Sequence, residues 1–209
     1  MKDIINNIFS IESESDFTDT ALKLFDYQIK NNNVYSNYIK LLGINLQPTS
    51  INEIPFLPIS LFKKEKIKCS NKRAEKIFYS SGTTKLKSKH IIQDLSIYDQ
   101  AYKKNFNSFY GDISEYCFLA LLPSYKENES SSLIYMMDGL INQGKNHNSG
   151  YYLRNYKELN TILKTLEKNK QKTILFGVTY ALIEFAKLFP QHLKNTIVME
   201  TGGMKGKRK

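Results

Sequence analysis

The stretch TILFGVTYALIEFAKLFPQHLKNTIVME, residues 173–200, contains the pattern that decides the fold. Apolar and β-branched residues at 173–176 predict a short buried strand, and the apolar residues of 179–189 recur with a helical period. A second β-branched run follows at 196–200. Two strands separated by a helix of about ten residues predict a crossover connection between parallel strands.

The same alternation of strands and helices extends toward the N-terminus. We expect strands at 76–79, 117–122 and 151–153, and helices at 94–109, 130–142 and 156–168. Such alternation is typical of a largely parallel sheet that helices cover on both faces. The predicted fold class is therefore α/β, with a mostly parallel sheet flanked by helices.

The opening third of the chain has a different, purely helical pattern, and Gly43 is the residue at which we expect the last helix to end. One apolar face is formed by Phe17, Ala21, Leu24, Phe25 and Ile29, and it continues with Tyr35, Tyr38, Ile39 and Leu42. Two prolines in the segment 54–59 then predict an extended, packed connector. We therefore divide the chain into a helical N-terminal segment, 1–47, and an α/β portion, 48–209.

Composition limits the possible classes of protein. A chain of 209 residues with 41% hydrophobic residues can bury a substantial core. The net charge of +10 suggests an anionic partner, but only Arg73, Arg154 and Arg208 offer the guanidinium group that nucleic-acid readout favours. The N-terminus lacks a signal-peptide pattern and the sequence lacks a long apolar run, which predicts a cytoplasmic protein without a membrane span. The two cysteines predict neither a disulfide framework nor a metal site.

A loop rich in hydroxyl groups follows the predicted strand 76–79 and is a candidate cradle for phosphates. Backbone N–H groups and small side chains can approach phosphate oxygens closely, and nearby lysines add positive charge. The sequence matches neither a Walker A motif nor a dinucleotide fingerprint, and many hydroxyl-rich turns are only turns. The loop consists of Ser80, Ser81, Gly82, Thr83 and Thr84, followed by Lys85, Lys87 and Lys89.

The string at 78–84, with Ser88-Lys89-His90 after it, resembles the phosphate loop of adenylate-forming enzymes. It is most similar to the acyl-protein synthetases of bacterial bioluminescence (LuxE type). Segments 54–63, 131–136 and 200–206 agree with that family in order and approximate spacing. The resemblance implies an adenylation domain that uses ATP and Mg²⁺ to convert a fatty or other carboxylic acid into an acyl adenylate, which then passes to a thiol.

The resemblance also implies roles for individual residues. Nucleotide binding falls to Ser80, Ser81, Gly82, Thr83, Thr84, Lys89, Gly202 and Gly203. The candidates for the acyl side are Tyr125, Ser131, Tyr135 and Tyr180, together with Pro123. For the aromatic residues among them a place in the core is an equally good interpretation.

The chain departs from the family pattern in two ways. Lys85 replaces a glycine of the loop, and the later motifs of the family, including its catalytic lysine and acyl-accepting cysteine, are not found after the glycine pair. We therefore expect the amino-terminal part of an acyl-activating enzyme, incomplete at its C-terminus, with an acyl-acceptor or acyl-reductase protein as partner. The alternatives are a nucleotide- or acyl-binding module without catalysis and, more distantly, a basic nucleic-acid-binding protein.

Overall fold

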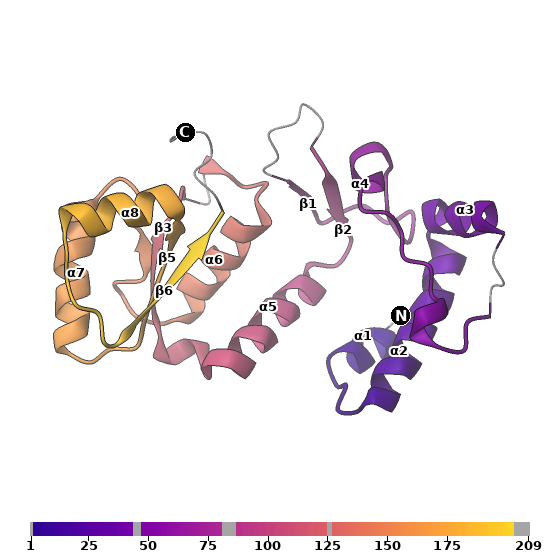
Figure 1. Ribbon diagram of the computed structural model, residues 1–209, viewed down its shortest axis with the longest axis horizontal. Helices are drawn as coiled ribbons and strands as arrows, with labels where there is room; N and C mark the ends of the chain where they lie inside the picture. Colours follow the sequence, from indigo (N-terminus) through magenta and orange to yellow (C-terminus); the bar gives the residue numbers. More distant parts are fainter. Residues whose placement is uncertain (1, 44–46, 81–86, 125–126, 203–209) are drawn as a thin grey trace. The chain divides into compact units, whose positions relative to one another are not determined.

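The computed structural model describes residues 2–43, 47–80, 87–124 and 127–202 (Figure 1). The chain divides into two compact units, Met1–Ala101 and Tyr102–Lys209. We describe each unit by itself. The division at residue 47 that the sequence suggests stays a prediction.

The first unit opens with the helices α1 (Lys2–Ile8), α2 (Glu14–Asn31) and α3 (Asn33–Leu42). A capping box between Ser13 and Asp16 starts α2, and the side chain of Asn32 caps α3. Gly43 ends α3 in the left-handed conformation that glycine adopts without strain, with a φ of 63°. The helical N-terminal segment and its glycine stop are confirmed.

A small apolar cluster holds these helices together. It consists of Phe25, Tyr35, Ile39 and Ile54, and the rings of Phe25 and Tyr35 meet edge to face at 6.1 Å. Phe17 and Leu42, which the periodicity places on the apolar face, are not buried in this cluster, because they are 48% and 43% exposed. The cluster contacts only the later turns of α2. The apolar periodicity of this helix therefore extends over residues that the cluster does not bury.

The connector at 54–59 lies between a 3₁₀ turn, η1 (Ile51–Glu53), and a short helix, α4 (Leu61–Lys64). Its Ile54 is buried and its Leu57 packs against the same apolar cluster. Phe56 and Ile59, however, are 74% and 83% exposed. The prediction of a packed segment is therefore right for one side of the connector and wrong for the other.

The strand predicted at 76–79 is present as β1 (Lys76–Tyr79), but it does not belong to the parallel sheet. It pairs antiparallel with β2 (Lys89–Ile92), so that Phe78 lies opposite His90. A strand within ten residues of another can pair through a simple hairpin, whereas a parallel partner requires a long crossover. The loop after β1 is thus a hairpin loop, which corrects its predicted position at the edge of a parallel sheet.

The second unit contains the parallel sheet, to which α5 (Leu95–Tyr110) and the turn η2 (Ile113–Glu115) lead. Its strands lie in the order β4-β3-β5-β6 and all neighbours are parallel. The strands are β3 (Cys117–Leu121), β4 (Gly150–Tyr151), β5 (Thr173–Val178) and β6 (Thr196–Thr201). The helices are α6 (Ser132–Gln143), α7 (Tyr156–Lys168) and α8 (Thr179–Leu188). The α/β fold class is confirmed.

The central strand β3 is buried along its whole length, and it pairs with β5 in a register that places Phe118 beside Ile174. Helices α7 and α8 pack against each other, with the rings of Tyr156 and Phe185 at 5.9 Å. They lie on one side of the strands in Figure 1, and α6 lies on the other. Both faces of the central strands are therefore covered, as a parallel sheet requires.

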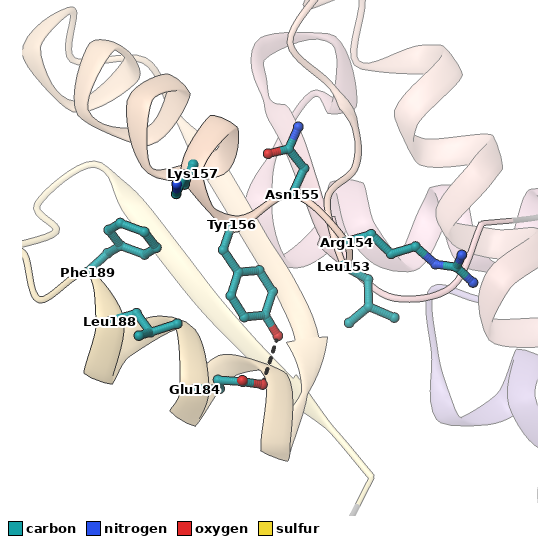
Figure 2. Close-up of a pocket in the computed structure, with 8 residues that line it drawn as sticks. All are labelled: Leu153, Arg154, Asn155, Tyr156, Lys157, Glu184, Leu188 and Phe189. Atoms are coloured by element: carbon teal, nitrogen blue, oxygen red, sulfur yellow. Dashed lines mark hydrogen bonds between the residues drawn. The ribbon is translucent and has the colours of Figure 1, made fainter.

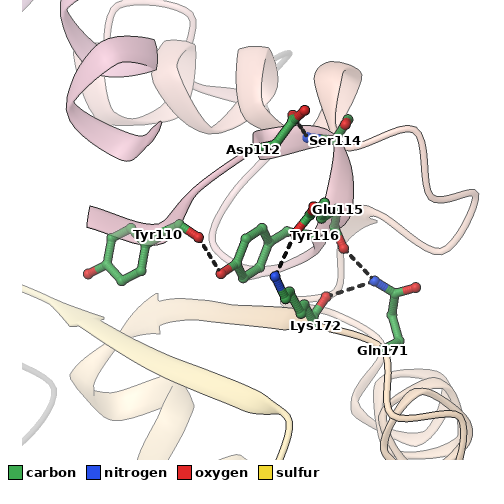
Figure 3. Close-up of polar contacts among 7 residues, drawn as sticks. All are labelled: Tyr110, Asp112, Ser114, Glu115, Tyr116, Gln171 and Lys172. Atoms are coloured by element: carbon green, nitrogen blue, oxygen red, sulfur yellow. Dashed lines mark hydrogen bonds and ion pairs between the residues drawn. The ribbon is translucent and has the colours of Figure 1, made fainter. Parts of the chain in front are cut away.

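A polar network closes the amino-terminal edge of this sheet (Figure 3). The Tyr116 hydroxyl donates to the carbonyl of Tyr110 at 2.7 Å, and the Lys172 ammonium meets the Glu115 carboxylate at 2.5 Å. The Gln171 side chain donates to the carbonyl of Glu115 at 2.6 Å. These contacts join the starts of β3 and β5 at the edge opposite the candidate site, so we assign them a structural role.

Within the described ranges, no helix is both long and apolar enough to cross a bilayer.

Candidate functional site

The carboxyl edge of the parallel sheet contains a reversal in the path of the chain. From β3 the chain passes through α6 to β4 on one side, whereas from β5 it passes through α8 to β6 on the other. Because such crossovers are right-handed, α6 and α8 leave adjacent strands toward opposite faces, as Figure 1 shows. Open α/β sheets bind ligands at this kind of switch point, beyond the carboxyl ends of the two strands.

Thr179, the first residue of α8, connects this point to the end of β6. Its hydroxyl oxygen lies within hydrogen-bonding distance of the Glu200 carboxylate and of the Gly202 carbonyl. A hydroxyl has one hydrogen, so it donates to one of these acceptors at a time. Gly202 has a φ of 71°, a left-handed conformation that other residues adopt only with strain. The start of α8 and the turn after β6 therefore form one polar group at the carboxyl edge.

Gly177 brings α8 close to the strands at the same place. A Cβ atom at this position would lie 2.9 Å from the Cβ of Leu121 and 2.9 Å from Cγ of Leu182. Only a residue without a side chain permits this approach. Gly177 therefore determines the position of the first turn of α8 relative to β3 and β5. This turn contains Thr179 and Tyr180.

The other side of the switch point is formed by the start of α6. Ser131 is its N-cap, and the Ser131 hydroxyl oxygen accepts a hydrogen bond from the backbone N–H of Ile134 at 3.4 Å. Tyr135 lies in the first turn of α6, and Tyr180 is a half-buried residue that packs against the core. The structure therefore brings Ser131, Tyr135, Tyr180 and Gly202 to one edge of the sheet.

Two residues that the sequence predicts to bind nucleotide, Ser80 and Lys89, belong to the first unit. The backbone N–H of Ser80 donates to the carbonyl of Ser88 at 3.1 Å, and the Ser88 N–H donates to the Ser80 hydroxyl oxygen at 3.0 Å. This pair closes the hairpin loop, and Lys89 follows as an exposed residue of β2. Ser81, Gly82, Thr83, Thr84, Tyr125 and Gly203 lie outside the described residues. The binding roles of all these residues stay predictions.

Sequence reasoning missed Thr179 and Glu200 as members of the site. A signal for Thr179 was present, because it begins the helix predicted at 179–189, which follows the strand predicted at 173–176. Residues at that position of a parallel sheet lie at the carboxyl edge by construction. Glu200 gives no such signal, since only the folded chain shows that its side chain turns toward Thr179.

The described thiols are poor candidates for an acyl acceptor. Cys117 is fully buried, and this burial raises the pKa of its thiol to about 11, although a hydrogen bond from Ser149 acts in the opposite direction. Burial also raises the pKa of Cys69. The thiolate is the nucleophilic form of cysteine, so neither side chain is activated at neutral pH.

The part of the chain that the structure describes contains no group of three or more His, Cys, Asp and Glu side chains able to hold a metal ion. Magnesium in nucleotide sites is often held by one or two carboxylates together with phosphate oxygens, and such a site needs no larger cluster. Among the described residues, Glu200 is one carboxylate that lies at the carboxyl edge.

A separate, open pocket lies between the start of α7 and the end of α8 (Figure 2). It has a volume of about 530 Å³ and is lined by Leu153, Arg154, Asn155, Tyr156, Lys157, Glu184, Leu188 and Phe189. The Tyr156 hydroxyl donates to the Glu184 carboxylate at 3.4 Å, and burial together with that carboxylate raises the pKa of Tyr156 to about 12. None of the site residues predicted from the sequence lines this pocket.

The fold and the polar edge define an open α/β protein with a candidate ligand site at a topological switch point. Comparison with known proteins adds a more particular likeness. The chain is 30% identical over 104 residues to a long-chain-fatty-acid–luciferin-component ligase of Vibrio harveyi, a match that covers 49% of this chain and 28% of the ligase. No family model matches the chain, and no solved structure matches it. The likeness supports a relationship to this ligase over part of both proteins.

Proposed function

We propose that this chain belongs to a ligase that activates a fatty acid with ATP and transfers the acyl group to a protein thiol. The observation that carries the proposal is the 30% identity to a fatty-acid ligase over 49% of this chain. The gathering of Ser131, Tyr180 and Gly202 at the carboxyl edge supports it, since that edge is where an open α/β sheet binds its ligand.

The proposed reaction has two steps. A carboxylate oxygen of the fatty acid attacks the α-phosphorus of ATP, the bond to the β-phosphate oxygen breaks, and pyrophosphate leaves. A thiolate then attacks the acyl carbonyl and displaces AMP. The first step turns a poor electrophile into a mixed anhydride with a good leaving group, which is the purpose of the adenylate.

In this proposal the hairpin loop at 80–84 binds phosphate oxygens through backbone N–H groups, and Lys89 adds positive charge. Gly202 and Gly203 allow the backbone to approach the adenosine, and Tyr125, Ser131, Tyr135 and Tyr180 line the acyl group. Magnesium would be held chiefly by the phosphate oxygens, the hard ligands that it prefers, and would neutralise their charge.

The acyl acceptor in this proposal is a partner protein and not this chain. Burial raises the pKa of both described thiols, that of Cys117 to about 11, and this favours their protonated, poorly nucleophilic form. An acyl-acceptor or acyl-reductase protein with an activated thiol would complete the second step.

A pyrophosphate-release assay tests the proposal. Release that requires both ATP and a long-chain fatty acid, when the chain is incubated with Mg²⁺, would establish the activation step in this chain and would overturn the expectation of an incomplete enzyme. Binding of the nucleotide or of the fatty acid without release would favour the alternative function, a binding module without catalysis, which the 28% coverage of the ligase also suits. If the chain neither bound these ligands nor released pyrophosphate, both the ligase function and the binding-module function would be contradicted.

A further inference from the structure

The exposed side of the connector between η1 and α4 combines two bulky apolar side chains with a cluster of lysines. Phe56 is 74% exposed and Ile59 is 83% exposed. Lys63, Lys64 and Lys66 follow and are all exposed. We call this surface, defined by these five residues, the connector face, and we propose that it docks on an anionic lipid surface.

The two apolar side chains are held outward by a rigid backbone. On the inner side Ile54 is buried and Leu57 packs against the apolar cluster of the first unit. The hydroxyl of Tyr35 donates to the carbonyl of Pro55 at 2.8 Å and ties the segment to α3. Because the prolines at 55 and 58 fix their own φ angles, the exposed side chains are presented without a large loss of entropy on docking.

The lysines follow these side chains closely in the sequence, and the chain turns directly after Ile59. Backbone N–H groups of Leu61 and Phe62 donate to the carbonyls of Pro58 and Ile59 at 3.0 and 3.2 Å, which starts α4. The ring of Phe62 meets that of His90 in β2 edge to face at 6.1 Å, so the inner side of α4 is packed. Lys63 and Lys64 are left on its outer side, with Glu65 as the single acidic residue among the lysines.

This combination of groups favours a lipid surface over other polyanions. Peripheral membrane proteins bind by burying apolar side chains at the headgroup boundary while lysines attract anionic headgroups. Phe56 and Ile59 suit the first requirement, whereas non-specific binding to nucleic acid depends chiefly on phosphate charge and requires no exposed aliphatic side chain. The proposal is independent of the ligase activity, because it uses none of the residues assigned to that site.

The absence of tryptophan from the sequence permits a clean insertion assay. Phe56→Trp places the sole tryptophan on the connector face. Phe109→Trp is the matched control, because Phe109 is 75% exposed and belongs to α5. With vesicles of phosphatidylglycerol and phosphatidylcholine we expect a blue shift of emission from the first variant and none from the second. Vesicles of phosphatidylcholine alone should give a much smaller shift.

The charge requirement is tested in the Phe56→Trp background with Lys63→Glu, Lys64→Glu and Lys66→Glu combined. We expect vesicle affinity to fall at least about tenfold, since each lysine near the surface contributes to attraction. Circular dichroism verifies that the variants keep their helices. An equal shift from both tryptophan variants, or an unchanged affinity of the charge-reversed variant, would overturn the proposal. So would a response of Phe56→Trp to oligonucleotides but not to vesicles, which would assign the face to nucleic acid.

Discussion

At the scale of single residues, Glu167 is the carboxylate with the densest set of partners. It lies near the end of α7 and accepts hydrogen bonds from the backbone N–H groups of Lys194 and Asn195 at 3.0 and 3.1 Å. The Thr196 hydroxyl donates to it at 2.7 Å. Burial acts to raise the pKa of Glu167, but these hydrogen bonds outweigh burial and lower it. The charged form is therefore stabilised in the folded chain, and it anchors the start of β6.

We predict that Glu167→Gln lowers the free energy of unfolding at pH 7 by about 1.5–3 kcal/mol, the range for hydrogen bonds to charged groups. A carboxyl group with a lowered pKa stabilises the fold above its unfolded-state pKa, and this contribution disappears as pH falls through the folded-state pKa. The difference between the proteins should thus shrink in acid. Urea unfolding at pH 7 and at about pH 4 measures it.

The control for this prediction is Glu129→Gln, because Glu129 is exposed in a turn. Its effect should stay within about 0.5 kcal/mol at both pH values. A destabilisation of Glu167→Gln that is equal at the two pH values would contradict the role of the charge.

At the scale of elements, Gly177 sets the distance between α8 and the sheet. A methyl group there would lie 2.9 Å from the Cβ of Leu121, an atom that cannot move without its strand. We predict that Gly177→Ala costs about 1–3 kcal/mol, the usual cost of overpacking. Thermal or urea unfolding gives the value.

Gly150→Ala in β4 is the matched control, because its Cβ would be 3.6 Å from the nearest atom, an ordinary contact. It should change stability much less. Equal losses of stability from the two substitutions would mean that replacing any strand glycine has this cost, and that the close approach of α8 is not its cause.

The sequence predicts elements well where the local pattern is strong. The helix at 156–168 has the predicted bounds, and the strands at 117–122 and 173–176 are present within two residues of their predicted ends. Partners across space are harder to predict. The pairing of β1 with β2 and the exposure of Phe17 and Phe56 depend on which surfaces meet, and periodicity does not report that.

The candidate site was predictable to a similar degree. Ser131, Tyr180 and Gly202 reach the carboxyl edge because each follows a strand or begins a helix, which is visible in the sequence. The contact of Thr179 with Glu200 and Gly202 is not visible there, since it joins the start of α8 to the end of β6, residues that are 21 and 23 positions apart in the chain.

At the scale of the whole molecule, the proposed function requires the carboxyl edge of the parallel sheet to bind an acyl adenylate. Thr179 is the most specific probe of this edge, because its hydroxyl meets both the Glu200 carboxylate and the Gly202 carbonyl. Thr161 provides a matched control on α7, where its hydroxyl donates to the carbonyl of Lys157 at 3.1 Å.

The most direct measurement is calorimetric titration with a non-hydrolysable analogue, an acyl sulfamoyl adenosine with a long acyl chain. The account predicts that the unmodified chain binds it, that Thr179→Val binds about tenfold more weakly through loss of a positioning hydrogen bond, and that Thr161→Val binds unchanged. The account is contradicted if the unmodified chain shows no binding, or if Thr179→Val and Thr161→Val bind the analogue equally well.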